Sequence, residues 1–170
     1  MSRELWLLRH GKAHRDLDVN DFERPLKKRG EQDVERIGVW MKQHGHIPDV
    51  VLSSPAKRAI DTARWACKTL GLPEQAIVQD RRLYFYGREG LREVLADQLV
   101  KQVLLVGHNP DLEELLVYLA GAVSVPSVDN LLPTAALARL RLPDDWRKLD
   151  AGCAELVSIT YAKSLQDVGL

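Results

Sequence analysis

Short apolar runs alternate along the chain with amphipathic segments, a pattern typical of α/β proteins. Residues 5–8 and 103–106 form continuous apolar runs, and residues 49–53 form a similar short run. Runs of this kind predict strands that are buried on both faces, as in a parallel sheet. A weaker strand is expected at residues 76–78.

Apolar residues at helical spacing predict a helix after each of these strands. The predicted helices cover residues 28–44, 54–70, 88–99 and 109–120. Ser54 and Asn109 are expected to cap the second and fourth helices, each with a proline at the first helical position. Leu99 is expected on the buried face of the third helix. Glycine marks the end of the other three, at Gly45, Gly71 and Gly121.

The last part of the chain departs from this alternation. Residues 136–142 and 154–160 have the pattern of strands without a convincing helix between them. They are expected to extend the sheet at one edge, with at least one of them antiparallel. The chain contains no internal repeat, low-complexity tract or linker. We therefore expect a single α/β domain over residues 1–170, built on a mostly parallel sheet.

Composition narrows the function classes. A chain of 170 residues, 45% of them hydrophobic, can bury one sizeable core. The 24 Lys and Arg residues balance 24 Asp and Glu residues, so the overall charge favours neither nucleic acid nor an anionic membrane as a partner. No apolar stretch has membrane-spanning length and the N-terminus lacks a signal pattern, which predicts a cytoplasmic protein. Cys67 and Cys153 lack metal-ligand spacing, so free thiols are expected.

Three of the predicted strands end in residues that suit phosphate chemistry. Arg9 and His10 follow the first strand, Arg58 follows the second, and His108 follows the strand at residues 103–106. If these strands are parallel, their carboxyl ends open onto the same side of the sheet. Two guanidinium groups beside a helix N-terminus would bind a dianion. Two imidazoles in the same place favour phosphoryl transfer to a nitrogen nucleophile.

Each of these residues alone has an ordinary structural explanation, and only their joint placement favours function. An exposed arginine in a first helical turn is usually a solvated charge, and a histidine at a helix start often bonds to nearby backbone. His14, His44 and His46 lack such a placement at a strand end. His44-Gly45-His46 is interpreted as a helix end and not as a metal site, because no Cys or paired acidic ligand accompanies it.

The segments that carry these residues resemble the signatures of a known family. They are Leu8-Arg9-His10-Gly11, residues 53–63 and Val106-Gly107-His108-Asn109-Pro110. In order and spacing they look like the three signatures of the histidine phosphatase (phosphoglycerate-mutase-like) superfamily. Arg24-Pro25-Leu26 followed by Arg29-Gly30 is similar to the short SixA-type phosphohistidine phosphatase group. The resemblance implies a three-layer α/β/α sandwich around a mostly parallel sheet.

The resemblance also implies a mechanism. His10 would attack phosphorus and become a transient phosphohistidine, while Arg9, Arg58 and His108 hold the phosphoryl oxygens. Arg24 is a further candidate for phosphate or substrate binding. No metal or other cofactor is implied, because the cationic side chains neutralise the developing charge. A neutral His10 and a protonated His108 would suit these roles.

A general acid is missing from the pattern. Larger relatives use a Glu from the segment after the third strand, but no acid aligns convincingly in residues 81–89 here. Glu89, Asp18 and Asp21 are weak candidates, each more simply explained as a solvated carboxylate. An alcohol leaving group depends strongly on a proton donor. The imidazole of a phosphohistidine leaves more readily, so the absence favours a phosphoramidate substrate.

The spacing between Arg58 and His108 leaves room for one strand and one helix but for no large cap. An uncapped site suits a phosphorylated side chain on a folded protein, such as a phosphohistidine-bearing phosphotransfer domain or carrier. Lys12 or Lys57 could then guide an acidic partner. A phosphatase of a small phosphorylated metabolite is the alternative enzyme, a mutase fits less well, and a phosphate-binding interaction module without catalysis also stays open.

Overall fold

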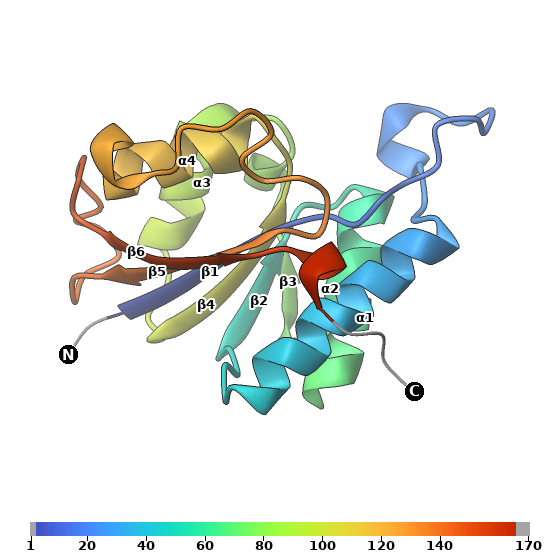
Figure 1. Cartoon of the computed structure of the whole chain (residues 1–170), viewed down its shortest axis with the longest axis horizontal. Helices are drawn as coiled ribbons and strands as arrows, with labels where there is room; N and C mark the ends of the chain where they lie inside the picture. Colours follow the sequence, from blue (N-terminus) through green and yellow to red (C-terminus); the bar gives the residue numbers. More distant parts are fainter. Residues whose placement is uncertain (1–2, 166–170) are drawn as a thin grey trace.

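The computed structural model describes residues 3–165 and contains a six-stranded mixed sheet flanked by helices (Figure 1). The strands are β1 (Arg3–Arg9), β2 (Val50–Ser53), β3 (Ile77–Gln79), β4 (Gln102–Gly107), β5 (Leu137–Leu142) and β6 (Glu155–Thr160). Their order in the sheet is β3-β2-β4-β1-β5-β6. The first four strands pair in parallel, whereas β5 is antiparallel to both β1 and β6. The predicted mostly parallel sheet with an antiparallel extension is confirmed.

The middle of the central strands β1 and β4 is continuously apolar, at residues 5–8 and 103–106, because both faces of the sheet are covered there. Leu5 and Leu7 of β1 face one hydrophobic cluster, and Trp6 and Leu8 face another. Side chains alternate between the faces of a strand, so a strand between two layers of helices has no polar face. The continuous apolar runs in the sequence have this physical cause.

Four helices form the outer layers. Helices α1 (Lys28–Gln43) and α2 (Lys57–Leu70) pack against each other on one face of the sheet. Helices α3 (Gly87–Ala96) and α4 (Asp111–Ala120) cover the other face (Figure 1). The three-layer α/β/α arrangement expected from the sequence is therefore present. Within residues 3–165, no helix is both long and apolar enough to cross a membrane.

Two helix starts differ from the prediction. Helix α2 begins at Lys57, and Ser54 lies before it, with its Oγ accepting a hydrogen bond from the Ala56 backbone N–H. Helix α4 begins at Asp111, and the Asn109 side chain does not cap it. Its Nδ2 donates instead to Glu113 and to the Leu132 carbonyl. Ser54 Oγ also lies 2.8 Å from His108 Nε2, so both side chains expected as caps contact residues from other parts of the chain.

The third helix is also shorter than its apolar pattern predicted. It ends at Ala96, and Leu99 lies in the following turn with 91% of its surface exposed. The expectation that Leu99 faces the core is therefore wrong. Leu91, Val94 and Leu95 do face it. Leu99 is at helical spacing from Leu95, so the pattern alone could not show that the chain turns before it.

The sheet register aligns the strand ends that carry the candidate residues. Arg9 of β1 is the Cα partner of Gly107 in β4, and Ser53 of β2 is the partner of Val106. One further pair continues past the strand, where the His10 backbone N–H donates to the Gly107 carbonyl at 3.2 Å. The carboxyl ends of β1, β2 and β4 therefore open onto one side of the sheet, as predicted.

Candidate active site

Two histidines and an arginine from three strand ends lie close together in a buried position. The ring centroids of His10 and His108 are 5.2 Å apart. His10 is 8% exposed, His108 is 1% exposed, and Arg58, from the first turn of α2, is 2% exposed. The close approach expected from the sequence is found.

The hydrogen bonds of His10 determine which ring nitrogen is available. Its Nδ1 donates to the carbonyl of Gly11 at 2.7 Å, because a carbonyl can only accept. In the neutral ring, Nε2 then carries the lone pair, which accepts a hydrogen bond from Arg58 Nε. The Arg58 Nε lies 3.4 Å from this Nε2, which places a cationic donor beside the nucleophilic atom. This arrangement presents His10 Nε2 as a nucleophile next to an anion-binding group.

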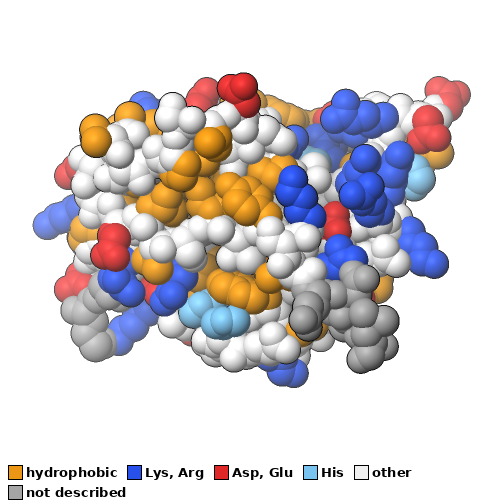
Figure 2. All heavy atoms as spheres, viewed as in Figure 1, with side chains coloured by type: hydrophobic (Ala, Val, Ile, Leu, Met, Phe, Trp, Pro, Cys, Tyr) orange, Lys and Arg blue, Asp and Glu red, His pale blue; other side chains and the backbone are white. Residues whose placement is uncertain are grey.

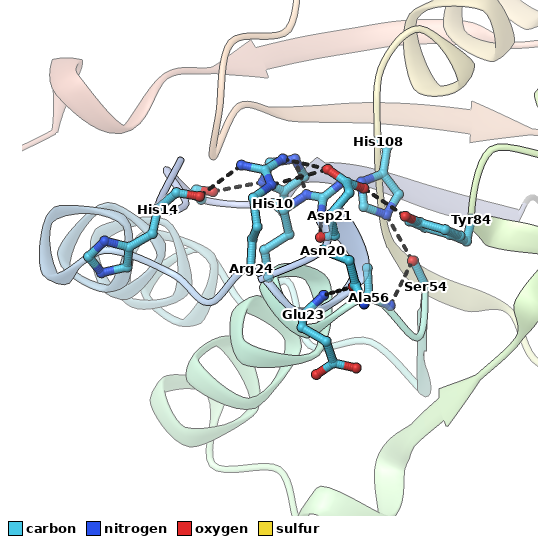
Figure 3. A network of polar contacts seen from close by, with 12 residues as sticks. His10, His14, Asn20, Asp21, Glu23, Arg24, Ser54, Ala56, Tyr84 and His108 are labelled. Carbon is cyan, nitrogen blue, oxygen red and sulfur yellow. Dashed lines mark hydrogen bonds and ion pairs between the residues drawn. The ribbon is translucent and has the colours of Figure 1, made fainter. Parts of the chain in front are cut away.

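Asp21 joins the arginines and a tyrosine of the site into one polar network (Figure 3). Arg58 donates to the Asp21 carbonyl at 2.7 Å and to its Oδ2 at 3.0 Å. Tyr84 Oη donates to the same Oδ2 at 2.6 Å. Arg24 binds the Asp21 Oδ1 through Nε and Nη2, and its Nη1 donates to the His14 carbonyl. Arg24 and Arg58 are therefore held in place by the same carboxylate.

Burial and nearby cations keep both histidines neutral. Burial lowers the pKa of His10 from 6.5 to about 3, and Arg58, Arg9 and Arg24 oppose protonation further, against the Gly11 hydrogen bond. Burial likewise lowers the pKa of His108 to about 3, with added contributions from His10 and Arg58. Both rings are therefore neutral near pH 7 in the free protein, and His108 is not the protonated group expected from its proposed role. A bound dianion would act in the opposite direction and raise both pKa values.

His108 is oriented from the opposite side of the site by Ser54. Its Nε2 lies at hydrogen-bond distance, 2.8 Å, from the Ser54 Oγ, as Figure 3 shows. Its Nδ1 is buried and has no partner among residues 3–165, and the same is true of Nε of Arg9. Arg9 uses its Nη1 for the Leu132 carbonyl, which fixes the guanidinium. Buried nitrogens without partners are costly, and an oxyanion bound in the cavity that Arg9 lines would accept a hydrogen bond from the Arg9 Nε–H.

Glycines let the chain after β1 pass directly against α1. A Cβ on Gly11 would lie 2.8 Å from the Gly30 carbonyl oxygen, and a Cβ on Gly30 would collide with the Lys12 backbone. The Gly11 N–H donates to Thr62 Oγ1, whose hydroxyl donates to the Arg58 carbonyl. Through these contacts, the backbone beside His10 is fixed to the first turn of α2. A side chain at either glycine would force the backbone beside His10 to shift.

These residues surround a partly open cavity of about 780 Å³. Arg9, His10, Arg24, Arg58 and His108, the five residues expected from the sequence, all line it. The other lining residues are Lys12, Ala13, Arg15, Asp21, Lys27, Phe85, Asn109, Asn130, Pro133 and Thr134. Among residues 3–165, no cluster of three His, Cys, Asp or Glu side chains is placed to hold a metal ion.

The three acids considered as proton donors differ in whether they line the cavity. Glu89 is exposed, pairs with Arg92 and Arg88, and does not line the cavity. Asp18 is also exposed and outside the cavity lining. Asp21 does line it, but burial, which favours its protonated form, is outweighed by hydrogen bonds from Tyr84, Arg24 and Arg58, so its pKa lies well below the usual range. Asp21 is therefore an anion that holds arginines and not a proton donor.

Phe85 is a lining residue that the sequence analysis did not find. Its ring lies 4.7 Å from the His108 ring and covers one side of it. The side chain is 46% exposed and the backbone has a φ of +59°, a conformation that costs a bulky residue about 1 kcal/mol or more. No sequence motif marks it. An exposed aromatic held in strained backbone against a buried histidine indicates a functional position.

The comparison with protein families agrees with this fold and site. The model of the histidine phosphatase superfamily (branch 1) matches residues 5–84. This segment includes His10 and Arg58, and the sheet and cavity described above complete the arrangement with His108. The chain belongs to the histidine phosphatase superfamily, branch 1.

Individual relatives place the chain near one group of this superfamily. The solved structure of SixA from Agrobacterium tumefaciens, assigned as a phosphohistidine phosphatase, is 29% identical with a TM-score of 0.77, over 94% of this chain and 98% of that one. SixA from Nakamurella multipartitia is 27% identical with a TM-score of 0.75, over 99% and 98% of the two chains. An uncharacterised protein of Mycobacterium tuberculosis strain H37Rv is 28% identical over 88% of this chain and 96% of its own. The structure is thus SixA-like.

Proposed function

We propose that this chain is a phosphohistidine phosphatase that works through a phosphohistidine on His10. The observation that carries the proposal is the state of the His10 ring. Nδ1 donates to the Gly11 carbonyl, the Nε2 lone pair faces Arg58 Nε at 3.4 Å, and burial with nearby cations lowers the pKa of His10 to about 3. His10 therefore needs no deprotonation at neutral pH. Arg9, Arg58 and His108 lie beside it to hold a phosphoryl group, so the site suits attack of His10 on phosphorus.

The reaction has two displacements at phosphorus. In the first, His10 Nε2 forms a bond to phosphorus as the bond to the leaving nitrogen breaks, and the leaving imidazole takes a proton from solvent. Arg9, Arg58 and His108 hold the three equatorial oxygens, which carry the developing charge. In the second, water attacks phosphorus and its proton goes to solvent. Inorganic phosphate leaves and His10 is regenerated.

The ionised state of the Asp21 carboxylate supports a phosphoramidate substrate. Asp21, the acid that lines the cavity within residues 3–165, is held ionised by Arg24, Arg58 and Tyr84. An ionised carboxylate cannot donate a proton to an alcohol leaving group. The imidazole of a phosphohistidine needs no acid in the site, because its second ring nitrogen takes a proton from solvent and the ring then departs as neutral imidazole. A protein phosphohistidine fits this site better than a phosphate monoester.

The cavity volume supports one alternative substrate, a small phosphorylated metabolite. About 780 Å³ lies within the range of small-molecule sites, so a small phosphorylated metabolite could occupy it. This alternative shares the nucleophile and phosphate ligands and differs only in the leaving group. A panel comparing a phosphohistidine protein with phosphate monoesters separates the two, and a clear preference for a monoester would reject the protein substrate.

A trapped intermediate tests the catalytic proposal itself. Protein mixed with ³²P-labelled phosphoramidate and quenched rapidly should carry label that is lost in acid and stable in base. The His10→Ala variant should carry none. If the wild-type protein forms no such adduct with any phosphodonor and still binds phosphoprotein, it is a binding module without catalysis.

A further inference from the structure

Positive charge is concentrated at the cavity although the chain as a whole is balanced. The sequence contains equal numbers of basic and acidic residues, 24 of each. The described residues that line the cavity include six Lys and Arg side chains and a single carboxylate, that of Asp21. Figure 2 shows Lys and Arg side chains gathered at the end of the molecule where Figure 1 places the loop between β1 and α1. This concentration exceeds what one phosphoryl group requires.

Three of the six cations have no task in the proposed chemistry. Arg24 and Arg58 lie in the polar network around His10 and Asp21, and Arg9 is held by the Leu132 carbonyl. The other three are Lys12, Arg15 and Lys27, here named the basic rim. Within residues 3–165 no carboxylate forms an ion pair with any rim side chain. The pKa of the nearby Asp16 carboxylate is lowered by hydrogen bonds from its own backbone N–H and from His14, 3.5 Å away, and only last by Lys27.

The backbone under the basic rim is built from two hydrogen-bonded segments. The Lys27 N–H donates to the Lys12 carbonyl at 2.8 Å, and the His14 N–H donates to the Pro25 carbonyl at 2.9 Å. A bridge between Ala13 and Leu26 lies between these bonds. Lys12 and Lys27 therefore have fixed positions next to each other, and Arg15 follows on the same segment. The rim is a defined surface and not three scattered side chains.

Exposure indicates what the basic rim binds. Lys12 and Arg15 are exposed and Lys27 is half-buried, whereas Arg58 is buried at the base of the cavity. A second anion on a small ligand is typically held by buried, two-pronged arginine contacts. Exposed, unpaired cations around the mouth of a site instead attract and orient a large charged partner. The rim therefore fits an extended acidic surface better than a second phosphate in the cavity.

We infer that the basic rim docks an acidic protein surface surrounding the phosphorylated histidine. The inference rests on the proposed function, since it names the partner of the same site. The partner chemistry is a phosphohistidine flanked by Asp and Glu residues that meet Lys12, Arg15 and Lys27. Of the two lysines considered from the sequence, Lys12 lies on this surface. Lys57 does not line the cavity and lies 3.6 Å from Asp61.

Two synthetic peptides provide the test. Each carries one phosphohistidine, flanked by Glu in the first peptide and by Gln in the second. The measured quantity is the ratio of their kcat/KM values at low ionic strength, which cancels any general effect on phosphate binding. We expect the wild-type protein to favour the Glu peptide by about tenfold, and 0.5 M NaCl to bring the ratio close to one.

Charge-reversal variants locate the effect. Lys12→Glu, Arg15→Glu and Lys27→Glu should each reduce the ratio by roughly fivefold. Lys42→Glu is the matched control, because Lys42 is exposed in the last turn of α1 and changes the net charge equally. It should leave the ratio unchanged. Thermal unfolding of every variant checks that the fold is retained.

The outcomes separate this inference from the proposed function. If both peptides are hydrolysed with equal kcat/KM, or if Lys42→Glu lowers the ratio as much as the rim variants, the docking surface is wrong while the phosphatase proposal stands. If neither peptide is hydrolysed, the phosphohistidine proposal fails. Fluorescence anisotropy with labelled unphosphorylated peptides then decides the docking question, and equal affinity for the two peptides would overturn it.

Discussion

Two pairs of histidines in this protein have similar ring separations but entirely different surroundings. His10 and His108 lie 5.2 Å apart at the carboxyl ends of β1 and β4. His44 and His46 lie 5.9 Å apart after the end of α1 and stack near Trp40. The first pair is buried among arginines, whereas His44 is exposed and its Nδ1 donates to the Trp40 carbonyl. Proximity of two imidazoles therefore does not define a catalytic site.

The difference lies in what fixes and surrounds each ring. The Gly11 carbonyl takes one nitrogen of His10 and Arg58 lies beside the other, so both the tautomer and the charge state are determined. At the helix end, His44 is exposed and its Nδ1 donates to the local Trp40 carbonyl. Burial and Arg139 also lower the pKa of His46, but neither His44 nor His46 lines the cavity. What separates the two pairs is therefore the anion-binding surroundings of His10 and His108.

Removing one histidine ring from each pair should give the largest difference in kcat. We expect His10→Ala to reduce kcat for phosphoramidate hydrolysis by about 10⁴-fold or more, because the attacking atom is lost. His44→Ala should retain wild-type kcat, because its ring lies outside the cavity. Steady-state phosphate release measures both. Comparable losses in the two variants would remove the distinction between the pairs.

The arginine beside His10 gives the next largest effect. Arg58→Lys keeps the positive charge but loses the planar fork that reaches His10 Nε2 and Asp21 together. We expect kcat/KM to fall by about 10²-fold to 10³-fold. Arg64→Lys, at a half-exposed position of the same helix, should change it less than twofold. Near-normal kinetics in Arg58→Lys would show that Arg58 does not bind the phosphoryl group.

The lowered pKa values of His10 and His108 make the stability of the folded protein sensitive to acid. In the folded state His10 and His108 have a pKa of about 3, against 6.5 ordinarily, so between these values the unfolded chain binds more protons. Their contribution to stability is complete above pH 6.5 and is lost as the pH falls toward 3. His10→Gln and His108→Gln should each flatten the decline of Tm between pH 7 and 4. His44→Gln should leave the slope of the wild-type protein intact, and a flattened slope there would contradict the assignment.

The smallest expected effect concerns Asp21. Its carboxylate occupies donors of Arg24 and Arg58 that face the cavity. Neutralising it in Asp21→Asn should free these donors and tighten inhibition by inorganic phosphate by about threefold to tenfold. Asp18→Asn, a change at an exposed residue outside the cavity, is the control. Weaker phosphate inhibition in Asp21→Asn would contradict this prediction, because it would show that the loss of the arginines' positions outweighs the donors that are freed.

Much of the fold could be predicted because local pattern decides it. Apolar runs at residues 5–8 and 103–106 fixed the central strands, and β1 and β4 are found there. Gly71 ends its helix as expected, in a left-handed conformation. The starts of α2 and α4 could not be placed from their proline signals, because Ser54 and Asn109 bond to residues from other parts of the chain. A local cap and a tertiary contact have the same sequence signature.

The sequence by itself determined which chemical groups stand at the carboxyl ends of the parallel strands. Those groups were enough to predict the superfamily and five of the residues that line the cavity. The tertiary structure alone decided the tautomer of His10, the neutral state of both pocket histidines and the binding of Asp21 to arginines. It also added Phe85 and the basic rim to the site. These properties arise from burial and from charges brought together across the fold, and hydrogen-bond geometry and Coulomb energy depend on distances that no local pattern records.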